Sequence, residues 1–528
     1  MTLSMPSLGS SRTDSATVGR WLIAMAVMAS AVMELVDTAA VNVSLPYIAG
    51  NLSASVNEAT WVLTSYLVAN AAVLPVTGWL ANYMGRKRLL MLAVTIFTVA
   101  SVLCGLATSL PLLIFFRILQ GAGGGSLQPT TRAILLETFP REERGKAMAF
   151  WGVGIVVAPI LAPVLGGWLT TDYTWRLVFF INVPISIVGL ILVHLFVRDP
   201  SYIRRTSNRI DYWGLGMLVT GIAALQVMFD KGQEDDWFGS HLIVTLAVVA
   251  VVCLTTFVIW ELRSKDPIVR FRLLKHRTFA VGVTLSAIMG IVLFGSTVLL
   301  PLFMQELLGF PAITAGKWNT PRGLATMIFM PLAGILISRR WDMRRLLFWG
   351  TLTAALGLFG FSFLNLSAGP WNFVLPEAVM GLGFSFIFVP LATITVDPIS
   401  AEDMGYATSI IALMRNVGGG LGISVVTTLL ARREQFHQDR LAAHITSFSP
   451  LTAPFLAGLH QRLAQHGATF TGAGRQGFEL LYGTLLKQAA VLSYLDAFRF
   501  LTLLFVLVSP IVWLMRKPHS GQGTESSE

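Results

Sequence analysis

Pro75-Val76-Thr77-Gly78-Trp79-Leu80, followed by Arg88, recurs later in the chain as Pro331-Leu332-Ala333-Gly334-Ile335-Leu336, followed by Arg344. Two further pairs recur at nearly the same spacing. Arg117-x-x-x-Gly121-x-Gly123 corresponds to Glu377-x-x-x-Gly381-x-Gly383, and Glu142-Glu143-x-Gly145-x-Ala147 corresponds to Glu402-Asp403-x-Gly405-x-Ala407. The chain is therefore predicted to consist of two parallel halves. Membrane proteins built in this way usually have a substrate path between the halves.

The composition indicates that most of the chain lies in a lipid bilayer. Of its 528 residues, 54% are hydrophobic and only 12% are charged, with a mean hydropathy of +0.68. In soluble domains, roughly a quarter of the residues are charged. Fourteen apolar runs are each long enough to cross about 30 Å of hydrocarbon. An all-α membrane protein is predicted, because backbone groups must be paired in lipid and the alternation typical of a membrane barrel is absent. The expected spans are 20–42, 59–81, 89–107, 111–135, 147–169, 176–197, 212–230, 241–261, 279–305, 313–337, 346–365, 371–396, 405–430 and 490–515.

Basic residues predict the orientation of these spans. With a cytoplasmic N-terminus, the inner connections hold most of the Lys and Arg residues, for example Arg86-Lys87-Arg88, whereas the short outer connections hold only Lys231 and Lys317. Both termini are therefore predicted to be cytoplasmic, in a multi-pass protein of the cell inner membrane. The net charge of +10 is interpreted as a topology signal, and no nucleic-acid partner is expected.

The first span leaves an alternative open. Ala29-Ser30-Ala31 is a small-residue pattern of the kind found at signal-peptide cleavage sites, and Arg20 precedes it. Against cleavage, the apolar run continues beyond Ala31.

Cys104 and Cys253 lie inside expected spans without metal-ligand spacing, so both are interpreted as packing residues. No metal or other cofactor is expected.

Among the charged residues, Glu34 and Asp37 are the strongest candidates for a functional role. They are three residues apart in the first span and therefore lie on one face of a helix. An acid deep in a span is costly and usually faces a cavity or a partner, where it can take up and release a proton. Arg117, in the fourth span, is the matching cation, because a guanidinium keeps its proton. Asp37, Glu34 and Arg117 are thus predicted to couple transport to protons, with Asp37 favoured; structural neutralisation by Arg117 is the alternative.

The second half carries its own intramembrane charges. Glu377 occupies the position of Arg117 in the repeat, so the two halves place opposite charges at equivalent positions. Arg322 and Arg415 also lie in second-half spans, and all three residues are candidates for lining a substrate cavity. Pairing of Glu377 with one of these arginines is equally compatible with the pattern. In the last span, Asp496 and Arg499 are expected to neutralise each other.

Small residues follow one face of the fifth span. Such residues, four apart, let a neighbouring helix approach closely, and interleaved prolines remove backbone hydrogen bonds and favour bending. This helix is expected to seal two halves that rock past each other; tight packing without a gating role is the alternative. The stripe consists of Gly154, Ala158, Ala162 and Gly166, with Pro159, Pro163 and Gly167 between them. The glycines at 121–125 are interpreted as packing residues, since no strand precedes them and no Gly-Lys-Ser/Thr follows.

Together these patterns resemble the EmrB-type, fourteen-helix drug:proton antiporters of the major facilitator superfamily. Four motifs carry the resemblance: Asp37-Thr38-Ala39-Ala40-Val41-Asn42-Val43-Ser44-Leu45-Pro46, Gly78-Trp79-Leu80-Ala81-Asn82-Tyr83-Met84-Gly85-Arg86-Lys87, Arg117-x-x-Gln120-Gly121 and Ala162-Pro163-x-x-Gly166-Gly167. The last is similar to the signature of exporters rather than importers. The resemblance adds Gly78, Gly85 and Arg86 as gating-motif residues, and Asn42 and Gln120 as further cavity candidates.

The resemblance also implies a domain organisation. It predicts a major facilitator fold with a cytoplasmic tail at 1–19, a six-helix bundle at 20–197, a linker with two inserted helices at 198–278, a second six-helix bundle at 279–515 and a cytoplasmic tail at 516–528. Asn82 stands where the superfamily usually has Asp. It therefore stays open whether a charged contact locks the halves at the cytoplasmic side. The fifth-span signature usually has Gly where Ala158 or Ala162 stands.

A long outer loop is expected at 431–489, within the second bundle. It carries four histidines, whose spacing fits no short metal-binding motif: His437, His444, His460 and His466. The loop resembles that of EmrB-type pumps, which work with a periplasmic adaptor protein and an outer-membrane channel. The resemblance implies both as partners.

The sequence thus predicts a proton-driven multidrug efflux antiporter that exports lipophilic small molecules by alternating access, a function associated with antibiotic resistance. An enzyme is not expected, because no nucleophile with a base and no soluble catalytic domain is found. Two alternatives stay open: a proton-coupled importer of a small organic solute, and a membrane receptor or enzyme without net transport. A broad apolar pocket carries no local code for one substrate.

Overall fold

The computed structural model describes residues 10–199, 211–264, 267–445 and 470–517, and a few residues between 446 and 469. Residues 518–528 of the expected tail 516–528, the first nine residues and the histidines His460 and His466 lie outside the described residues. In the described part of the chain, fourteen helical segments are long and apolar enough to cross a membrane. No strand occurs in these ranges. The predicted all-α class and the predicted number of spans are confirmed.

The first half contains six of the spans. Three of its spans consist of consecutive shorter helices; Pro75 lies at the break in one of them and the glycines that end α6 lie at the break in another. The elements are α1 (Ser10–Asn51), α2 (Val56–Ala59), α3 (Trp61–Val73) with η1 (Leu74–Val76) and α4 (Thr77–Met84), α5 (Arg86–Leu106), α6 (Leu110–Gly124) with α7 (Leu127–Thr138), α8 (Arg144–Asp172), and α9 (Leu177–Phe180) with α10 (Asn182–Phe196).

Two inserted helices and six further spans complete the chain. The inserted helices are α11 (Tyr212–Lys231) and α12 (His241–Arg263); the short helix η2 (Trp237–Gly239) lies between them and η3 (Phe271–Lys275) follows them. The second half contains α13 (Arg277–Leu302) with η4 (Phe303–Leu307), α14 (Ala312–Ser338), α15 (Met343–Gly360) with η5 (Phe361–Phe363), α16 (Trp371–Ile394), α17 (Met404–Ala442), and α19 (Phe470–Val508) with η6 (Ser509–Leu514).

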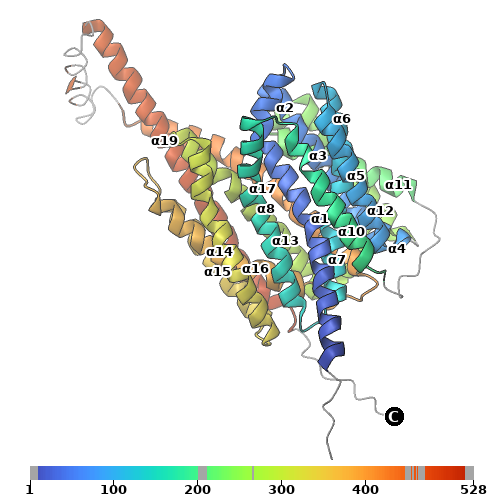
Figure 1. Cartoon of the computed structure of the whole chain (residues 1–528). Coiled ribbons are helices and arrows are strands. Elements are labelled where there is room, and N and C mark those ends of the chain that lie inside the picture. The colour runs from blue at the N-terminus through green and yellow to red at the C-terminus, as the bar shows by residue number, and fades with distance from the viewer. Residues whose placement is uncertain are drawn as a thin grey trace, which may run out of the picture.

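The helices pack as two groups. In the first half, α1 packs against α8 and α10, and α6 packs against α3 and α5; in the second, α16 packs against α14 and α15, and α13 against α17. Figure 1 shows α14, α15 and α16 on one side of the molecule and α3, α5 and α6 on the other. The inserted helix α11 packs against α12 and also reaches α3 and α17. This arrangement agrees with two six-helix bundles plus an inserted pair.

The expected outer loop is shorter than predicted. Helix α17 continues to Ala442 and α19 begins at Phe470, so both ends of the 431–489 segment are helical. Each of these helices has 39 residues, a length of about 58 Å at 1.5 Å per residue. Figure 1 shows α19 extending beyond the other helices. Hydropathy could not predict this, since the added turns are polar.

The last span also corrects a pairing expected from the sequence. Asp496 lies 3.5 Å from Arg499, as expected, but its closer partners come from α17. Arg433 and His437 lie 2.6 and 2.8 Å from the Asp496 carboxylate. These contacts tie α19 to α17 where both helices leave the bundle.

Repeated glycines place the two halves in backbone contact. A Cβ atom added to Gly78 of α4 would lie 2.6 Å from the Cα of Tyr406, and the Cα of Gly78 lies 3.6 Å from the position of a Cβ on Gly405. The equivalent repeat residues make the reciprocal contact, because a Cβ on Gly334 of α14 would lie 2.8 Å from the carbonyl oxygen of Gly145 of α8. The internal repeat therefore produces two matching crossings, α4 with α17 and α14 with α8.

Polar contacts accompany the first crossing, on the side predicted to be cytoplasmic. The Asn82 side chain donates to the carbonyl oxygen of Glu402 at 3.3 Å, and Arg86 donates to that of Ala401 at 3.3 Å. Arg270, which follows the inserted helices, forms an ion pair with Asp403. The charged Arg86 side chain thus joins the halves although Asn82 carries no charge, and the pair of Arg270 with Asp403 ties the linker to the second half. Arg86 is also ion-paired with Glu137, and Gly85 adopts φ +91°, which favours glycine.

The small-residue stripe of α8 packs differently from the expectation. A Cβ on Gly154 would meet Met28 and Val32 of α1, and a Cβ on Gly166 would meet Ala40 of α1. Ala158 and Ala162 of the same stripe are buried. The stripe therefore packs α8 against α1 within the first half, whereas other residues of α8 make its contact with α14 of the second half, and the sealing role of this helix stays a prediction. Pro159 and Pro163 are exposed on another face, while Gly145 and Gly152 contact α14.

Candidate functional site

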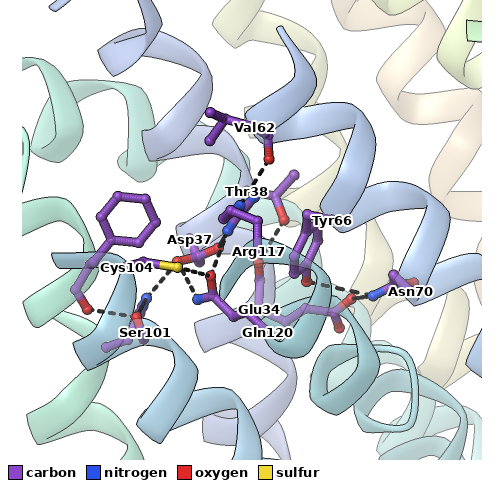
Figure 2. Close-up of polar contacts among 12 residues, drawn as sticks. Glu34, Asp37, Thr38, Val62, Tyr66, Asn70, Ser101, Cys104, Arg117 and Gln120 are labelled. Atoms are coloured by element: carbon purple, nitrogen blue, oxygen red, sulfur yellow. Dashed lines mark hydrogen bonds and ion pairs between the residues drawn. The ribbon is translucent and has the colours of Figure 1, made fainter. Parts of the chain in front are cut away.

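A buried ion pair joins α1 to α6. Asp37 and Arg117 are both fully buried, and the Arg117 Nη1 atom lies 2.7 Å from Asp37 Oδ2. The other carboxylate oxygen of Asp37 accepts hydrogen bonds from Gln120 Nε2 at 2.9 Å and Asn182 Nδ2 at 2.6 Å. Figure 2 shows Asp37 enclosed by the side chains of Arg117 and Gln120. Three donors from α6 and α10 thus bind the Asp37 carboxylate.

Arg117 is held by more than its acidic partner. Its Nε atom donates to the carbonyl oxygen of Val62 at 3.0 Å, and Nη1 also lies 2.7 Å from Gln120 Oε1. The guanidinium carbon lies 4.2 Å from the ring centroid of Tyr66, a cation–π distance. The Nη2 atom is buried without a hydrogen-bond partner among the described residues. The cation is therefore fixed in place and retains one unused donor.

The hydrogen-bond network continues to α10 and α5. Asn182 Nδ2 also lies 3.0 Å from Ser101 Oγ, which donates to the carbonyl oxygen of Phe179 at 2.8 Å. Cys104 is buried, and its sulfur lies 3.6 Å from Gln120 Oε1. Four spans of the first half thus converge on Asp37.

Glu34 lies one turn earlier on α1 and faces another environment. Its Oε1 atom accepts a hydrogen bond from Asn70 Nδ2 at 2.9 Å, whereas Oε2 is buried without a partner among the described residues (Figure 2). The charge of Glu34 interacts with that of Arg415, which belongs to α17 of the other half. Arg415 Nη2 in turn donates to Gln128 Oε1 of α7 at 2.8 Å. Glu34 therefore lies where the two halves meet.

The second half holds its own buried acidic residue, Glu377, and a cation beside it, Arg322. Glu377 of α16 is fully buried, and its carboxylate lies 3.5 Å from Nε of Arg322. Arg322 also lies within hydrogen-bond distance of Ser296, at 3.2 Å, and of Thr297, at 3.1 Å. At the offset that relates Gly78 to Gly334, Arg322 corresponds to Tyr66, which stacks on Arg117. The first of these equivalent positions thus holds Tyr66 in one half and Arg322 in the other. The second position holds Arg117 in one half and Glu377 in the other.

The structure brings some predicted site residues together and separates others. Asp37, Arg117 and Gln120 form one cluster, Glu34 and Arg415 lie at the boundary between the halves, and Arg322 pairs with Glu377. Asn42 is exposed and has no recorded contact with these groups among the described residues. No group of His, Cys, Asp or Glu side chains in the described ranges could hold a metal ion.

Two residues were missed by the sequence analysis. Asn182 contacts Asp37 directly, but a lone amide in an apolar span is a weak signal. Arg132 of α7 is 5% exposed and lies inside a candidate span. An arginine in such a position meets the criterion that singled out Arg117, so the signal was present.

Comparisons with known proteins find similarity over most of the chain. Residues 27–423 match the family model of the Major Facilitator Superfamily. The chain is 38% identical to the fatty acid resistance protein FarB of Neisseria gonorrhoeae, with 93% of this chain and 95% of that protein covered. It is 36% identical to the multidrug export protein EmrB of Haemophilus influenzae and 34% identical to EmrB of Escherichia coli K12, in each case over 95% of this chain and 96% of the relative.

Solved structures share the fold at low sequence identity. The human organic anion transporter MFSD10 superposes with a TM-score of 0.58 at 14% identity, covering 92% of this chain and 99% of that chain. The proton:xylose symporter XylE superposes with a TM-score of 0.56 at 15% identity, covering 94% and 96%. At such identities these likenesses show the fold alone.

Proposed function

Because the chain belongs to the major facilitator superfamily, we propose that it is a proton-driven exporter of lipophilic compounds that works by alternating access. The family and the fold point to a transporter rather than an enzyme. The fourteen apolar helices found in the described part of the chain, together with its relatives, indicate a multi-pass protein of the cell inner membrane. Two relatives support export as the direction and lipophilic compounds as the cargo, since they are named a multidrug export protein and a fatty acid resistance protein.

The observation that carries the proposal is the buried pair of Asp37 and Arg117. A charged pair inside a membrane span is expensive, and such groups usually serve ion pathways. When Asp37 takes up a proton, Arg117 loses its counter-charge, although Val62 and Tyr66 still hold its side chain. The network around Asp37 is then less stable in its present arrangement. Proton binding and proton release thus favour two different packings of the first half.

A path leads from this pair to the other half. Asp37 and Glu34 lie on α1, and the small-residue stripe of α8 packs directly on α1. The opposite contacts of α8, at Gly145 and Gly152, are with α14 of the second half. A displacement of α1 is therefore transmitted through α8 to the crossing between the halves. This coupling is the step that alternating access requires.

The proposal is tested with everted membrane vesicles energised by a proton gradient. Vesicles that contain the native protein are expected to accumulate at least one of three probes: Nile red, ethidium or decanoate. The Asp37→Asn variant should reduce accumulation to the level of vesicles without the protein, because an amide cannot carry the coupled proton. Asp172→Asn is the matched control, since Asp172 is exposed at the end of α8.

Three outcomes would contradict the proposal. Full accumulation by Asp37→Asn would show that this carboxylate does not carry the coupled proton. Accumulation only in right-side-out vesicles would identify an importer. Binding of probes without flux in either orientation would favour a receptor.

We also propose a periplasmic adaptor protein and an outer-membrane channel as partners. The support is the projection of α17 and α19 beyond the bundle, held together by the contacts of Asp496 with Arg433 and His437. Deletion of residues 446–469 should abolish export from whole cells while leaving proton-dependent accumulation in vesicles intact. Unchanged export from whole cells would refute the partnership.

A further inference from the structure

The inserted helix α11 packs against both halves. It contacts α3 of the first half along its length and also contacts α17 of the second half. A Cβ atom added to Gly420 of α17 would lie 3.4 Å from the side chains of Gln226 and Phe229 on α11, an ordinary van der Waals distance. Direct contact between α3 and α17 is sparse by comparison. Helix α11 therefore mediates most of the packing between α3 and α17.

Charged groups attach one end of α11, the end predicted to be outer, to the first half. Lys231 is 6% exposed and donates to Thr60 Oγ1 at 3.0 Å. Its ammonium group lies 5.8 Å from the ring centroid of Trp61, a cation–π distance. Asp230, the preceding residue, accepts a hydrogen bond from Thr64 Oγ1. Hydrogen bonds to charged groups are roughly twice as strong as those between neutral groups. This end of α11 is therefore held firmly to the start of α3.

The contact of the same end with the second half is weaker. Trp237, in the turn that follows α11, donates from Nε1 to Thr428 Oγ1 of α17 at 2.9 Å and to Gln233 Oε1 at 3.1 Å. All three groups are neutral. The Thr428 hydroxyl donates its own hydrogen to the carbonyl oxygen of Ser424 at 2.8 Å, so it accepts from the indole. Among the described residues, this hydrogen bond is the polar contact that ties the turn to the second half.

The turn that presents Trp237 has a strained backbone. Asp236 and Trp237 both adopt left-handed conformations, with φ of +55° and +47°. An aspartate tolerates this region, but for a bulky side chain such a φ is an outlier that costs free energy. The Trp237 amide donates to the carbonyl oxygen of Gly232 at 2.7 Å, and a Cβ on Gly232 would lie 2.7 Å from the indole ring. The strain offsets part of the stabilisation that the bond to Thr428 contributes, so this contact is released at little cost.

We propose that α11 moves with the first half during transport, and that Trp237 forms a releasable latch to the second half. The latch is the hydrogen bond between Trp237 and Thr428. When the halves rock, the distance between α3 and α17 changes on this side. The charged contacts of Lys231 and Asp230 then keep α11 on α3, whereas the neutral bond of the latch breaks. Trp237 is in this sense a positioning residue, which acts through the place of α17. The inference rests on alternating access as part of the proposed function.

The first test determines which half α11 follows. Spin labels are placed pairwise at three exposed positions: Glu58 before α3, Asp235 after α11 and Gln435 on α17. The native cysteines are replaced by alanine, and double electron–electron resonance is recorded in nanodiscs as the pH is varied. Labels at Glu58 and Asp235 should keep one distance, whereas labels at Asp235 and Gln435 should show two distances whose ratio changes with pH. The reverse pattern would overturn the assignment of α11 to the first half.

The second test removes the latch and follows labels at Glu58 and Gln435. Trp237→Phe keeps an aromatic ring but loses the donor, and Thr428→Val loses the acceptor. Each should lower the population with the distance of the present structure by about 2- to 13-fold relative to the other population. This is the effect of one neutral hydrogen bond of about 0.5–1.5 kcal/mol, at about 1.36 kcal/mol per factor of ten. The double variant should change the ratio no more than either single variant, because both remove the same bond. Thr428→Ser keeps the hydroxyl and should restore the native ratio.

Two matched controls lie beside the latch. Thr427→Val removes a hydroxyl that donates to carbonyl oxygens of its own helix, at Ile423 and Ser424, at 3.0 and 3.1 Å. Phe238→Leu changes the exposed neighbour of Trp237. Both variants should keep the native ratio of the two populations, which separates the latch from general effects on the turn or on α17.

Two results would overturn the latch. One is a native ratio of populations in Trp237→Phe. The other is addition of the effects of Trp237→Phe and Thr428→Val in the double variant, which would show that they act independently. Failure of the proposed function would look different: labels at Glu58 and Gln435 in the native protein would show a single distance at every pH. That result would exclude alternating access, and the latch with it.

Discussion

The crossing of α4 with α17 allows a quantitative prediction for Gly78→Ala. The added methyl group would lie 2.6 Å from Tyr406 Cα, 2.7 Å from Tyr406 N and 2.9 Å from the Gly405 carbonyl carbon. All three atoms are backbone, so no side-chain rotation relieves the clash and the helices have to separate. Overpacking of this kind costs about 1–3 kcal/mol. Because 1.36 kcal/mol corresponds to a factor of ten, the population with this crossing closed should fall by about 5- to 150-fold relative to the open one.

The separation of the halves can be measured by double electron–electron resonance. Spin labels on Tyr83 and Glu402, in a background with Cys104→Ala and Cys253→Ala, report the distance across the crossing. Gly78→Ala should broaden the distance distribution and shift it to longer values. Gly216→Ala on α11 is the matched control, because no atom lies within 4 Å of a Cβ at that position. The reasoning would be refuted if Gly78→Ala left the distance distribution unchanged while the same pair of labels still responded to a change in pH.

Three further predictions concern the buried and interhelical charges. Arg322→Gln should lower the melting temperature more than Glu377→Gln, because it leaves a buried carboxylate without its cation, a loss of about 3–5 kcal/mol; a thermal-shift assay on both variants decides. At the start of α15, burial works to raise the pKa of Asp342, but hydrogen bonds from the side chain and backbone of Arg344 outweigh it and hold that pKa below its usual value. The ionised Asp342 therefore stabilises the fold above its unfolded pKa of about 3.9, and this stabilisation is lost as the pH falls through the lower folded pKa. The difference in melting temperature between the native protein and Asp342→Asn should accordingly shrink below about pH 4. Arg270→Gln breaks the ion pair that holds the linker to Asp403 beside the crossing of α4 with α17. It should increase labelling of a cysteine placed at position 81 by a water-soluble maleimide, and equal labelling in both proteins would contradict this role.

Much of the fold could be predicted because its signal is local. An apolar run of sufficient length predicts a span wherever it occurs, and the internal repeat predicts two halves. The lengths of α17 and α19 could not be predicted in this way, since their outer turns, such as those around Arg433, are polar. Hydropathy detects contact with lipid and is blind to a helix that continues into water.

The site was predictable only in part. Asp37 and Arg117 could be found because ionisable residues in apolar runs are rare, whereas the amide of Asn182 has no such signature. Small-residue spacing correctly predicted that a helix packs closely on α8. It could not predict which helix, because Gly154 and Gly166 are compatible with any partner whose backbone can approach. Only the fold assigns that partner as α1 and not a helix of the other half.

At the two glycine crossings the halves meet main chain to main chain. At such a seam, which here means the contact between the two helix backbones at each crossing, no substitution can make a side chain smaller, because glycine has none. Every inherited substitution there can only widen it, and a wider seam admits water and ions on the side predicted to face the cell interior. New cargo preferences therefore have to evolve in the walls of the transport path, while the seam itself stays as it is.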